Sequence, residues 1–161
     1  MKIRKATADD IHAMIELARA SVTAAHWTEL QYRDLLTPAA AAHRLAVVAE
    51  AGWDVSNSAA SDNSERLLGF LIARFITPEC ELENIVVSPA ARRRGVGKQL
   101  LKSLLLAAHE TNIESVFLEV RESNSAARAF YEQAEFKFDG RRKSYYSNPS
   151  EDAILYRLAV R

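Results

Sequence analysis

Four basic residues and two glycines lie together ahead of a predicted helix, in the segment Arg92-Arg93-Arg94-Gly95-Val96-Gly97-Lys98. The first amide groups of a helix lack intrahelical acceptors and carry the positive end of the helix dipole, so they attract anions. Gly95 and Gly97 would let the backbone approach an anion closely, and the basic side chains would add charge around it. The segment therefore predicts a diphosphate site. The alternative is a basic helix start that binds no ligand.

Three residues further along the chain are suited to proton chemistry or ligand binding, namely Glu119, Asn124 and Tyr131. Glu119 is on a predicted strand whose apolar neighbours Leu118 and Val120 face the other way. Asn124 would open the next helix, and Tyr131 would lie two turns into it. Each also has a purely structural interpretation. Glu119 could be a solvated residue paired with an arginine, Asn124 a helix cap, and Tyr131 a core aromatic whose hydroxyl reaches the surface.

Two blocks of this sequence resemble a known family. The strand that ends in Val87-Ser88-Pro89, followed by Arg92-x-x-Gly95-x-Gly97, resembles the acetyl-CoA loop of the GNAT superfamily. The run from Leu118 to Glu132, which reads Leu-Glu-Val-Arg-x-Ser-Asn-x-x-Ala-x-x-x-Tyr-Glu, is similar to the bacterial ribosomal-protein-alanine N-acetyltransferases of that superfamily. The likeness covers about half of the chain, from Glu81 to Leu155, and is weaker before it, where Trp27-Thr28 resembles a pair near the family's second helix.

The resemblance implies a role for each of these residues. Glu119 would be the general base that deprotonates the acceptor ammonium, and Tyr131 the general acid that protonates the leaving thiolate of coenzyme A. Asn124 would contact coenzyme A. The backbone of the strand residues Ile85, Val86 and Val87 would bind the acetyl group and the pantetheine arm. The arm would extend the sheet much as an additional strand does. The diphosphate loop would comprise Arg92, Arg93, Arg94, Gly95, Val96, Gly97 and Lys98.

Two features leave the assignment of the catalytic residues undecided. Glu81 and Glu83 are rival bases, because many GNAT enzymes use an acid on that strand and residues two apart share a face. The family usually has a glycine where this chain has Glu135, at a helix end that needs a left-handed backbone. A glutamate in that conformation costs about 1 kcal/mol, or else the helix ends differently.

The order of the predicted elements indicates an α/β (mixed α+β) fold. The expected strands are 2–5, 45–49, 67–76, 81–88, 115–121, 136–142 and 153–160, and the expected helices are 11–24, 28–38, 96–108 and 124–133. Strands followed by helices, with antiparallel pairs at both ends, predict a mixed sheet with helices on both faces. In the GNAT fold this sheet is mostly antiparallel and splayed in the middle. We expect one domain over residues 1–161, with a loop over 52–65 that is flexible and inert or, alternatively, a lid on the substrate side.

Composition narrows the classes of function. The 161 residues carry 21 basic and 21 acidic side chains, so no overall positive field favours nucleic acid or an anionic membrane. The single cysteine, Cys80, allows no intramolecular disulfide, and we interpret it as a small apolar strand residue. The four histidines have no metal-ligand spacing, so we expect no metal. With no secretory or membrane-spanning pattern, we expect a cytoplasmic protein, monomer or homodimer.

Three functions remain open at this stage. The first is direct transfer of an acetyl group from acetyl-CoA to the N-terminal amine of a protein such as a ribosomal protein, within a ternary complex. The second is acetylation of a small amine. The third is an acetyl-CoA-binding domain without catalytic activity. The presence of both Glu119 and Tyr131 disfavours the third, while Tyr145-Tyr146 and the basic residues before them would shape a peptide groove in the first.

Overall fold

The computed structural model describes residues 1–21, 23–52 and 67–160, in which seven strands form one sheet of order β1-β2-β3-β4-β5-β7-β6. Every neighbouring pair is antiparallel except β4 and β5, which are parallel. The strands are β1 (Lys2–Lys5), β2 (Arg44–Glu50), β3 (Leu67–Ile76), β4 (Glu79–Val87), β5 (Ser115–Arg121), β6 (Lys137–Tyr146) and β7 (Glu151–Ala159). The predicted mixed, mostly antiparallel sheet is confirmed.

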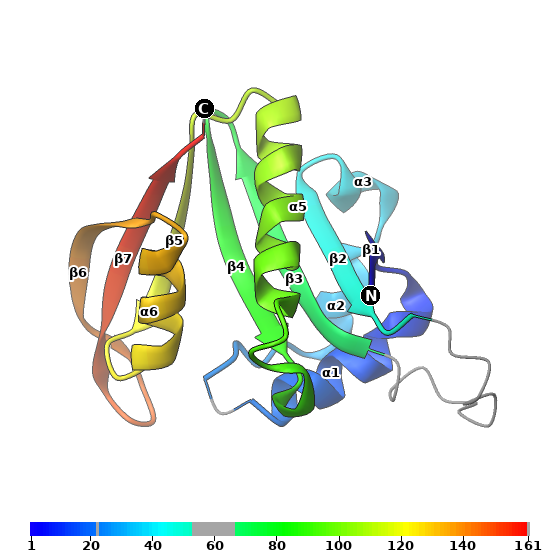
Figure 1. Cartoon of the computed structure of the whole chain (residues 1–161), viewed down its shortest axis with the longest axis horizontal. Coiled ribbons are helices and arrows are strands. Elements are labelled where there is room, and N and C mark those ends of the chain that lie inside the picture. The colour runs from blue at the N-terminus through cyan, green and yellow to red at the C-terminus, as the bar shows by residue number, and fades with distance from the viewer. Residues whose placement is uncertain (22, 53–66, 161) are drawn as a thin grey trace.

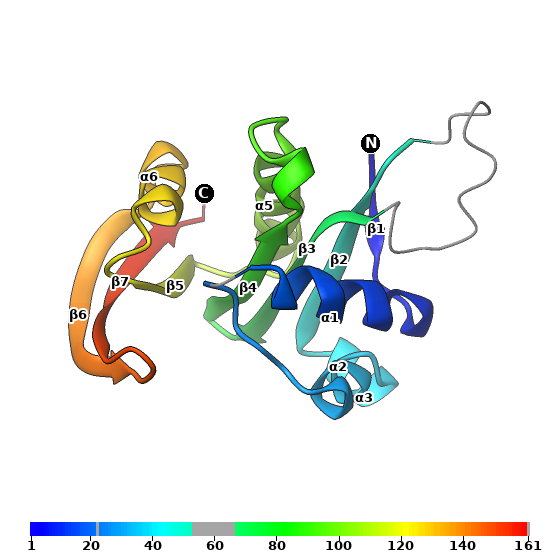
Figure 2. The same ribbon diagram turned by 90° about the horizontal axis from the view of Figure 1, so that it is seen from below.

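Helices cover both faces of this sheet, as predicted. Figure 2 shows α5 and α6 on one side and α1, α2 and α3 on the other. Residues alternate along β2, so that Val47 and Ala49 pack beneath α5 while Val48 packs beneath α1 and α2. The α-helices are α1 (Ile11–Arg19), α2 (Glu29–Leu35), α3 (Pro38–Ala41), α5 (Val96–Glu110) and α6 (Ser125–Gln133), and two short 3-10 turns are η1 (Ala8–Asp10) and η3 (Pro89–Ala91).

The sheet opens between its two central parallel strands. β4 and β5 pair over three residues of each, Glu79–Glu81 with Ser115–Phe117, and then separate (Figure 1). Just beyond the last pair, the register of β4 against β3 shifts, because Ala73 lies opposite Leu82 while Ile72 lies opposite Asn84. Glu83 is therefore an extra residue, a β-bulge, and a bulge bends and twists its strand. The predicted splay is confirmed, and the bulge gives it a physical cause.

Some element boundaries differ from the prediction. The first helix ends at Arg19 rather than near residue 24, and Pro38 opens a separate short helix because proline fits the first turn. β6 continues to Tyr146, four residues beyond its predicted end. The predicted loop over 52–65 lies, apart from Gly52, outside the described residues. In the described part of the chain, no helix is long and apolar enough to cross a membrane.

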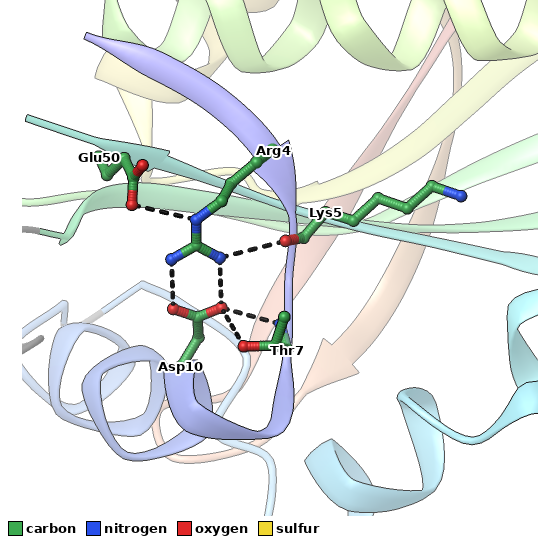
Figure 3. Close-up of polar contacts among 5 residues, drawn as sticks. All are labelled: Arg4, Lys5, Thr7, Asp10 and Glu50. Atoms are coloured by element: carbon green, nitrogen blue, oxygen red, sulfur yellow. Dashed lines mark hydrogen bonds and ion pairs between the residues drawn. The ribbon is translucent and has the colours of Figure 1, made fainter. Parts of the chain in front are cut away.

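An ion-pair network fixes the start of the chain to the sheet. The Arg4 guanidinium donates to both carboxylate oxygens of Asp10, at 2.7 and 2.9 Å, and through Nε to Glu50 at 3.0 Å (Figure 3). The Asp10 carboxylate also accepts the Thr7 N–H at 2.8 Å, which is part of a capping box at the start of this helical segment. β1, β2 and the start of α1 are thereby held together, which orients α1 across the sheet.

Candidate active site

The basic, glycine-containing segment forms the turn between β4 and α5. Gly95 is the N-cap of α5 with φ of 82°, a left-handed conformation that glycine adopts without steric cost, and Arg93 also has a positive φ of 61°. Since glycine has no side chain to accept from the first turn, the amide groups of that turn remain available to an anion. The basic side chains around them are exposed, and these are Arg92, Arg93, Arg94 and Lys98.

Gly97 lies in the first turn of α5, where α5 comes close to α6. A Cβ atom built on Gly97 would lie 3.4 Å from Cζ of Phe130 on α6 and 3.7 Å from Cγ2 of Val87 on β4. Its Cα therefore faces the space between the two helices, above the open part of the sheet. Because Gly97 has no side chain, no atom of α5 fills the space next to Phe130 and Val87 at this point.

Beyond Glu81, the edge of β4 that faces β5 has no strand of the described residues paired to it, and the Val87 carbonyl there accepts a hydrogen bond from Arg92 Nε at 3.4 Å. Ser88 N–H donates to the carbonyl oxygen of Leu68 on β3 at 2.9 Å, and backbone groups point to the same side at every second residue. Val86 therefore faces β3, and its carbonyl oxygen lies 2.5 Å from a Cβ built on Gly69. Ile85 and Val87 point the other way, where β5 has already separated. Two of the three predicted strand residues thus present backbone donors and acceptors at an open edge.

Glu119 lies on β5, on the face opposite the core residues beside it. Its carboxylate pairs with Arg142 Nε at 2.9 Å, and its side chain is 14% exposed against 54% for Arg142. The Glu119 carboxylate, as a hydrogen-bond partner, raises the pKa of Tyr145, with burial as the next cause. The arginine partner that a structural role would require is thus present, and Glu119 also remains partly open to solvent.

Tyr131 lies on α6 in an apolar environment. It is 6% exposed, and its ring packs against those of Phe130, Phe136 and Tyr156, with centroids 5.3, 5.7 and 6.4 Å away. Burial raises the pKa of Tyr131 well above its usual value, and the charge of Tyr146 adds to the shift. A phenol in this position keeps its proton at neutral pH and can donate it.

Tyr146, at the end of β6, links the two predicted catalytic residues. Burial raises the pKa of Tyr146 to about 12, and the charge of Glu119 adds to the shift, just as Tyr146 affects Tyr131. The rings of Tyr145 and Tyr146 meet edge to face at 5.2 Å, and the Arg121 guanidinium lies 4.3 Å from the centre of the Tyr146 ring. The sequence assigned the two tyrosines to a groove, but it did not indicate that the charges of Glu119 and Tyr131 both couple to Tyr146.

Asn124 and Glu135 define the two ends of α6. Asn124 is the N-cap, where its side-chain oxygen accepts the Ala127 N–H at 3.1 Å, so its amide group remains free to donate. Glu135 has φ of 68°, so the left-handed conformation expected of a glycine is adopted by a glutamate. The N–H of Phe136 bonds to the Tyr131 carbonyl and that of Glu135 to the Glu132 carbonyl, which is a Schellman ending.

The rival acids Glu81 and Glu83 lie on the same side of the sheet as α1 and α2, and both are ion-paired. Glu81 pairs with Arg74 and Glu83 with Arg44, each at 2.6 Å. Burial raises the pKa of Glu83, and the charge of Glu81 adds to this, against the opposing effect of Arg44. Glu83 also lines a cavity of about 440 Å³ beside α2, which sequence reasoning missed because distant segments form it.

Cys80 is fully buried in the core beneath α5, where we expected a small apolar strand residue. Burial raises the pKa of its thiol to about 12, and Glu81 and Glu83 add to the shift. The thiolate is therefore scarce at neutral pH, and the thiol is a poor nucleophile there. This confirms the interpretation of Cys80 as a core residue.

Known proteins are similar to this chain in sequence and in architecture. The [ribosomal protein bS18]-alanine N-acetyltransferase of Salmonella typhimurium is 37% identical over 98 residues, which cover 60% of this chain and 66% of the relative. That of Haemophilus influenzae is 39% identical over 95 residues, covering 57% and 64%. The matches thus span slightly less than two thirds of these relatives' length.

The likeness extends further in the structure than in the sequence. The crystal structure of the ribosomal-protein-S18-alanine N-acetyltransferase from Escherichia coli matches with a TM-score of 0.76 and 25% identity, over 99% of this chain and 93% of that one. The model of the acetyltransferase (GNAT) family matches residues 12–136, which include β4, the glycine-containing turn, β5 and α6. The chain belongs to the acetyltransferase (GNAT) family.

Proposed function

We propose that this protein transfers an acetyl group from acetyl-CoA to the N-terminal amine of a protein, by direct transfer in a ternary complex. The observation that carries the proposal is the open edge of β4, which begins beside the exposed start of α5 and leads toward Glu119 and Tyr131. An acyl-pantetheine arm could extend the sheet there as an added strand. Family membership and the names of the relatives point to the same chemistry.

The coenzyme would bind mainly through the backbone. Its diphosphate would accept hydrogen bonds from the first amides of α5, with Arg92, Arg93, Arg94 and Lys98 around it. Its pantetheine arm would pass Gly97 and pair with the backbone groups of Ile85 and Val87, where it would displace Arg92 from the Val87 carbonyl. The free amide group of Asn124, on the far wall of the opening, would donate a hydrogen bond to it. No metal enters this proposal.

Proton transfer would divide between two residues. The acceptor ammonium loses a proton to the Glu119 carboxylate, directly or through water, and the free amine attacks the acetyl carbonyl carbon. A carbon–nitrogen bond forms and the carbon–sulfur bond breaks. Tyr131, which burial keeps protonated, donates its proton to the departing thiolate. As the amide forms, the nitrogen loses its second proton, which restores the Tyr131 phenol directly or through water, and the proton held by Glu119 passes to solvent. The products are the acetylated amine and coenzyme A, and Glu83 is the alternative base if Glu119 serves only to hold Arg142.

The acceptor is the part of the proposal that relies most on the relatives, whose names specify an alanine of ribosomal protein bS18. A ribosomal-protein N-terminus is therefore our first choice. Tyr145 and Tyr146 support it, because an edge-to-face aromatic pair beside Glu119 provides a wall against which a peptide can lie. The cytoplasmic location, the single-domain organisation and a monomeric or homodimeric state remain predictions.

The test is release of free coenzyme A thiol in the presence of two matched sets of acceptors. One set comprises peptides with a free N-terminus, each with its N-acetylated form as control, and the other comprises small amines and free amino acids. We expect turnover with the free peptides and none with the blocked forms. Turnover with small amines alone would show that the acceptor is a small amine and not a protein N-terminus. Calorimetric binding of acetyl-CoA without any turnover would show that the domain is catalytically silent.

A further inference from the structure

The cavity beside α2 lies on the side of the sheet that the coenzyme does not occupy in the proposed function. Its volume is about 440 Å³, and its walls come from α2, from the segment before it and from the sheet. Trp27, Leu35 and Ala40 supply apolar surface, while Asp34, Arg44 and Glu83 supply charge. A site with an apolar wall and charged groups beyond it suits a long side chain that has an apolar stem and a charged end.

The charges in the cavity favour a cation. Glu83 is held there by the β4 bulge, with a side chain 13% exposed, and Arg44 is committed to it at 2.6 Å. Asp34 lines the cavity from the exposed side of α2. Arg74 also lies 3.7 Å from Glu83, but its closer partner, at 2.6 Å, is Glu81. With this pair included, three carboxylates face two guanidinium groups, which leaves one excess negative charge.

Carboxylates also connect the cavity to the reacting centre. Glu81 lies next to Glu83 along β4 and raises its pKa, and Glu81 likewise contributes to the raised pKa of Tyr145, whose main cause is Glu119. The strand register agrees with this, because Glu81 lies opposite Phe117 and Glu119 is two residues further along β5, so both carboxylates lie on one face of the sheet. A chain that brings its amine to Glu119 could pass Tyr145 and Glu81 and reach the cavity with a following side chain.

We propose that this cavity binds a lysine or arginine side chain of the acceptor peptide, at the second or third residue after the acetylated amine. This rests on the proposed function and names the class of its substrate. The stem would pack against Trp27 and Leu35, and the cationic end would lie between Asp34 and Glu83. Successive side chains of an extended peptide point to opposite sides, so one of the two positions faces the cavity and the other faces away.

The first experiment measures kcat/KM for peptides that differ at one position. Lysine, norleucine and glutamate are placed in turn at the second and at the third residue, with the rest of the peptide constant. At one of the two positions we expect lysine to be preferred to norleucine by about 10-fold, with glutamate lower still, and the difference to appear in KM. At the other position the three peptides should be alike.

The second experiment reverses the charge of the cavity without changing Glu83, the alternative base. Asp34→Lys should invert the preference, so that the glutamate peptide becomes the better substrate, while Asp34→Asn should reduce the preference for lysine. Glu29→Gln is the matched control, because it removes an acid from the same helix outside the cavity, and it should retain the wild-type preference. A merely structural role of Asp34 would change all peptides equally.

The outcomes separate the two proposals. Equal kcat/KM for all peptides at both positions, or an Asp34→Lys enzyme that still prefers lysine, would overturn the cavity assignment and leave N-terminal acetylation standing. Absence of turnover with every peptide would overturn both. A preference for lysine that Asp34→Lys inverts and Glu29→Gln retains would establish the cavity as the specificity site.

Discussion

Two ionisable residues near the opening of the sheet occupy contrasting environments. Tyr131 is buried among three aromatic rings, and burial raises its pKa, whereas Glu119 is partly exposed and paired with Arg142. Burial keeps the phenol of Tyr131 protonated at neutral pH, as the proposed general acid requires, and Glu119 keeps the solvent access that the proposed base requires. Both roles can be tested by single substitutions.

Replacing Tyr131 with phenylalanine tests the acid. Tyr131→Phe should lower kcat by about 10²-fold or more, because no phenol remains to protonate the thiolate, while the dissociation constant for acetyl-CoA stays nearly unchanged. Steady-state kinetics and calorimetry measure the two quantities. Since the ring stays in its aromatic cluster, the thermal midpoint should match the wild type. A wild-type kcat would show that Tyr131 is not the general acid, and the family resemblance would then hold for the fold and for coenzyme binding only.

Replacing Glu119 with glutamine tests the base. At neutral pH the acceptor amine is mostly an ammonium ion, so Glu119→Gln should reduce turnover most there. As the pH rises, the free amine becomes abundant and needs no base, so part of the rate should return. The measurement is the pH dependence of kcat/KM for both enzymes. If the two profiles coincide, the base is Glu83 or Glu81, and Glu83→Gln becomes the variant to compare.

At the scale of elements, most strands and helices could be predicted from period and caps, but the bulge at Glu83 could not. The alternation of glutamate and apolar residues along β4 ends at Glu83-Asn84 and is followed by Ile85-Val86-Val87. A strand that becomes covered on both faces gives the same change, so only the pairing with β3 identifies the extra residue. The cavity was missed for a related reason, because it combines Trp27, Arg44 and Glu83, which are far apart in the chain.

The start of α5 offers a direct test of coenzyme binding. Gly97→Asp should weaken acetyl-CoA binding at least about tenfold, because a carboxylate would repel the diphosphate and the side chain would crowd Phe130. Gly97→Ala is the control for size, since its Cβ would lie 3.4 Å from the Phe130 ring without adding charge. Calorimetry gives both affinities. An unchanged affinity in the aspartate variant would exclude this turn as the diphosphate site.

The end of α6 stores backbone strain that a single change should relieve. Glu135 has φ of 68° in the Schellman ending, where glycine carries no Cβ penalty, so Glu135→Gly should raise the free energy of unfolding by about 1 kcal/mol. Asn112, with φ of 57° just after α5, is the matched comparison. Asparagine tolerates this conformation better, so Asn112→Gly should stabilise less. Urea denaturation measures both; no gain in the Glu135 variant would contradict the strain.

At the scale of the whole molecule, the opened sheet gives two substrates separate approaches to one point. α5 and α6 lie on one face of the sheet and α1, α2 and α3 on the other (Figure 2). Glu81, Glu83, Glu119 and the cavity lie on the face of α1 and α2. In the proposed function, coenzyme and acceptor would therefore be bound at the same time, with the open edge of β4 between them. Such an arrangement needs no acetylated enzyme to carry the group from one site to the other.

The kinetic order of the reaction follows from this geometry. We expect double-reciprocal plots for acetyl-CoA and a peptide acceptor to intersect, as they do for a ternary complex, rather than run parallel. Cys80 is the one thiol of the chain, yet it is fully buried with a raised pKa, so Cys80→Ala should retain the wild-type kcat within about twofold. Parallel plots, or an enzyme that mass spectrometry finds acetylated after incubation with acetyl-CoA alone, would require a covalent intermediate. Retained activity in Cys80→Ala together with intersecting plots would leave direct attack by the amine as the route, with the two faces of the sheet each delivering one substrate.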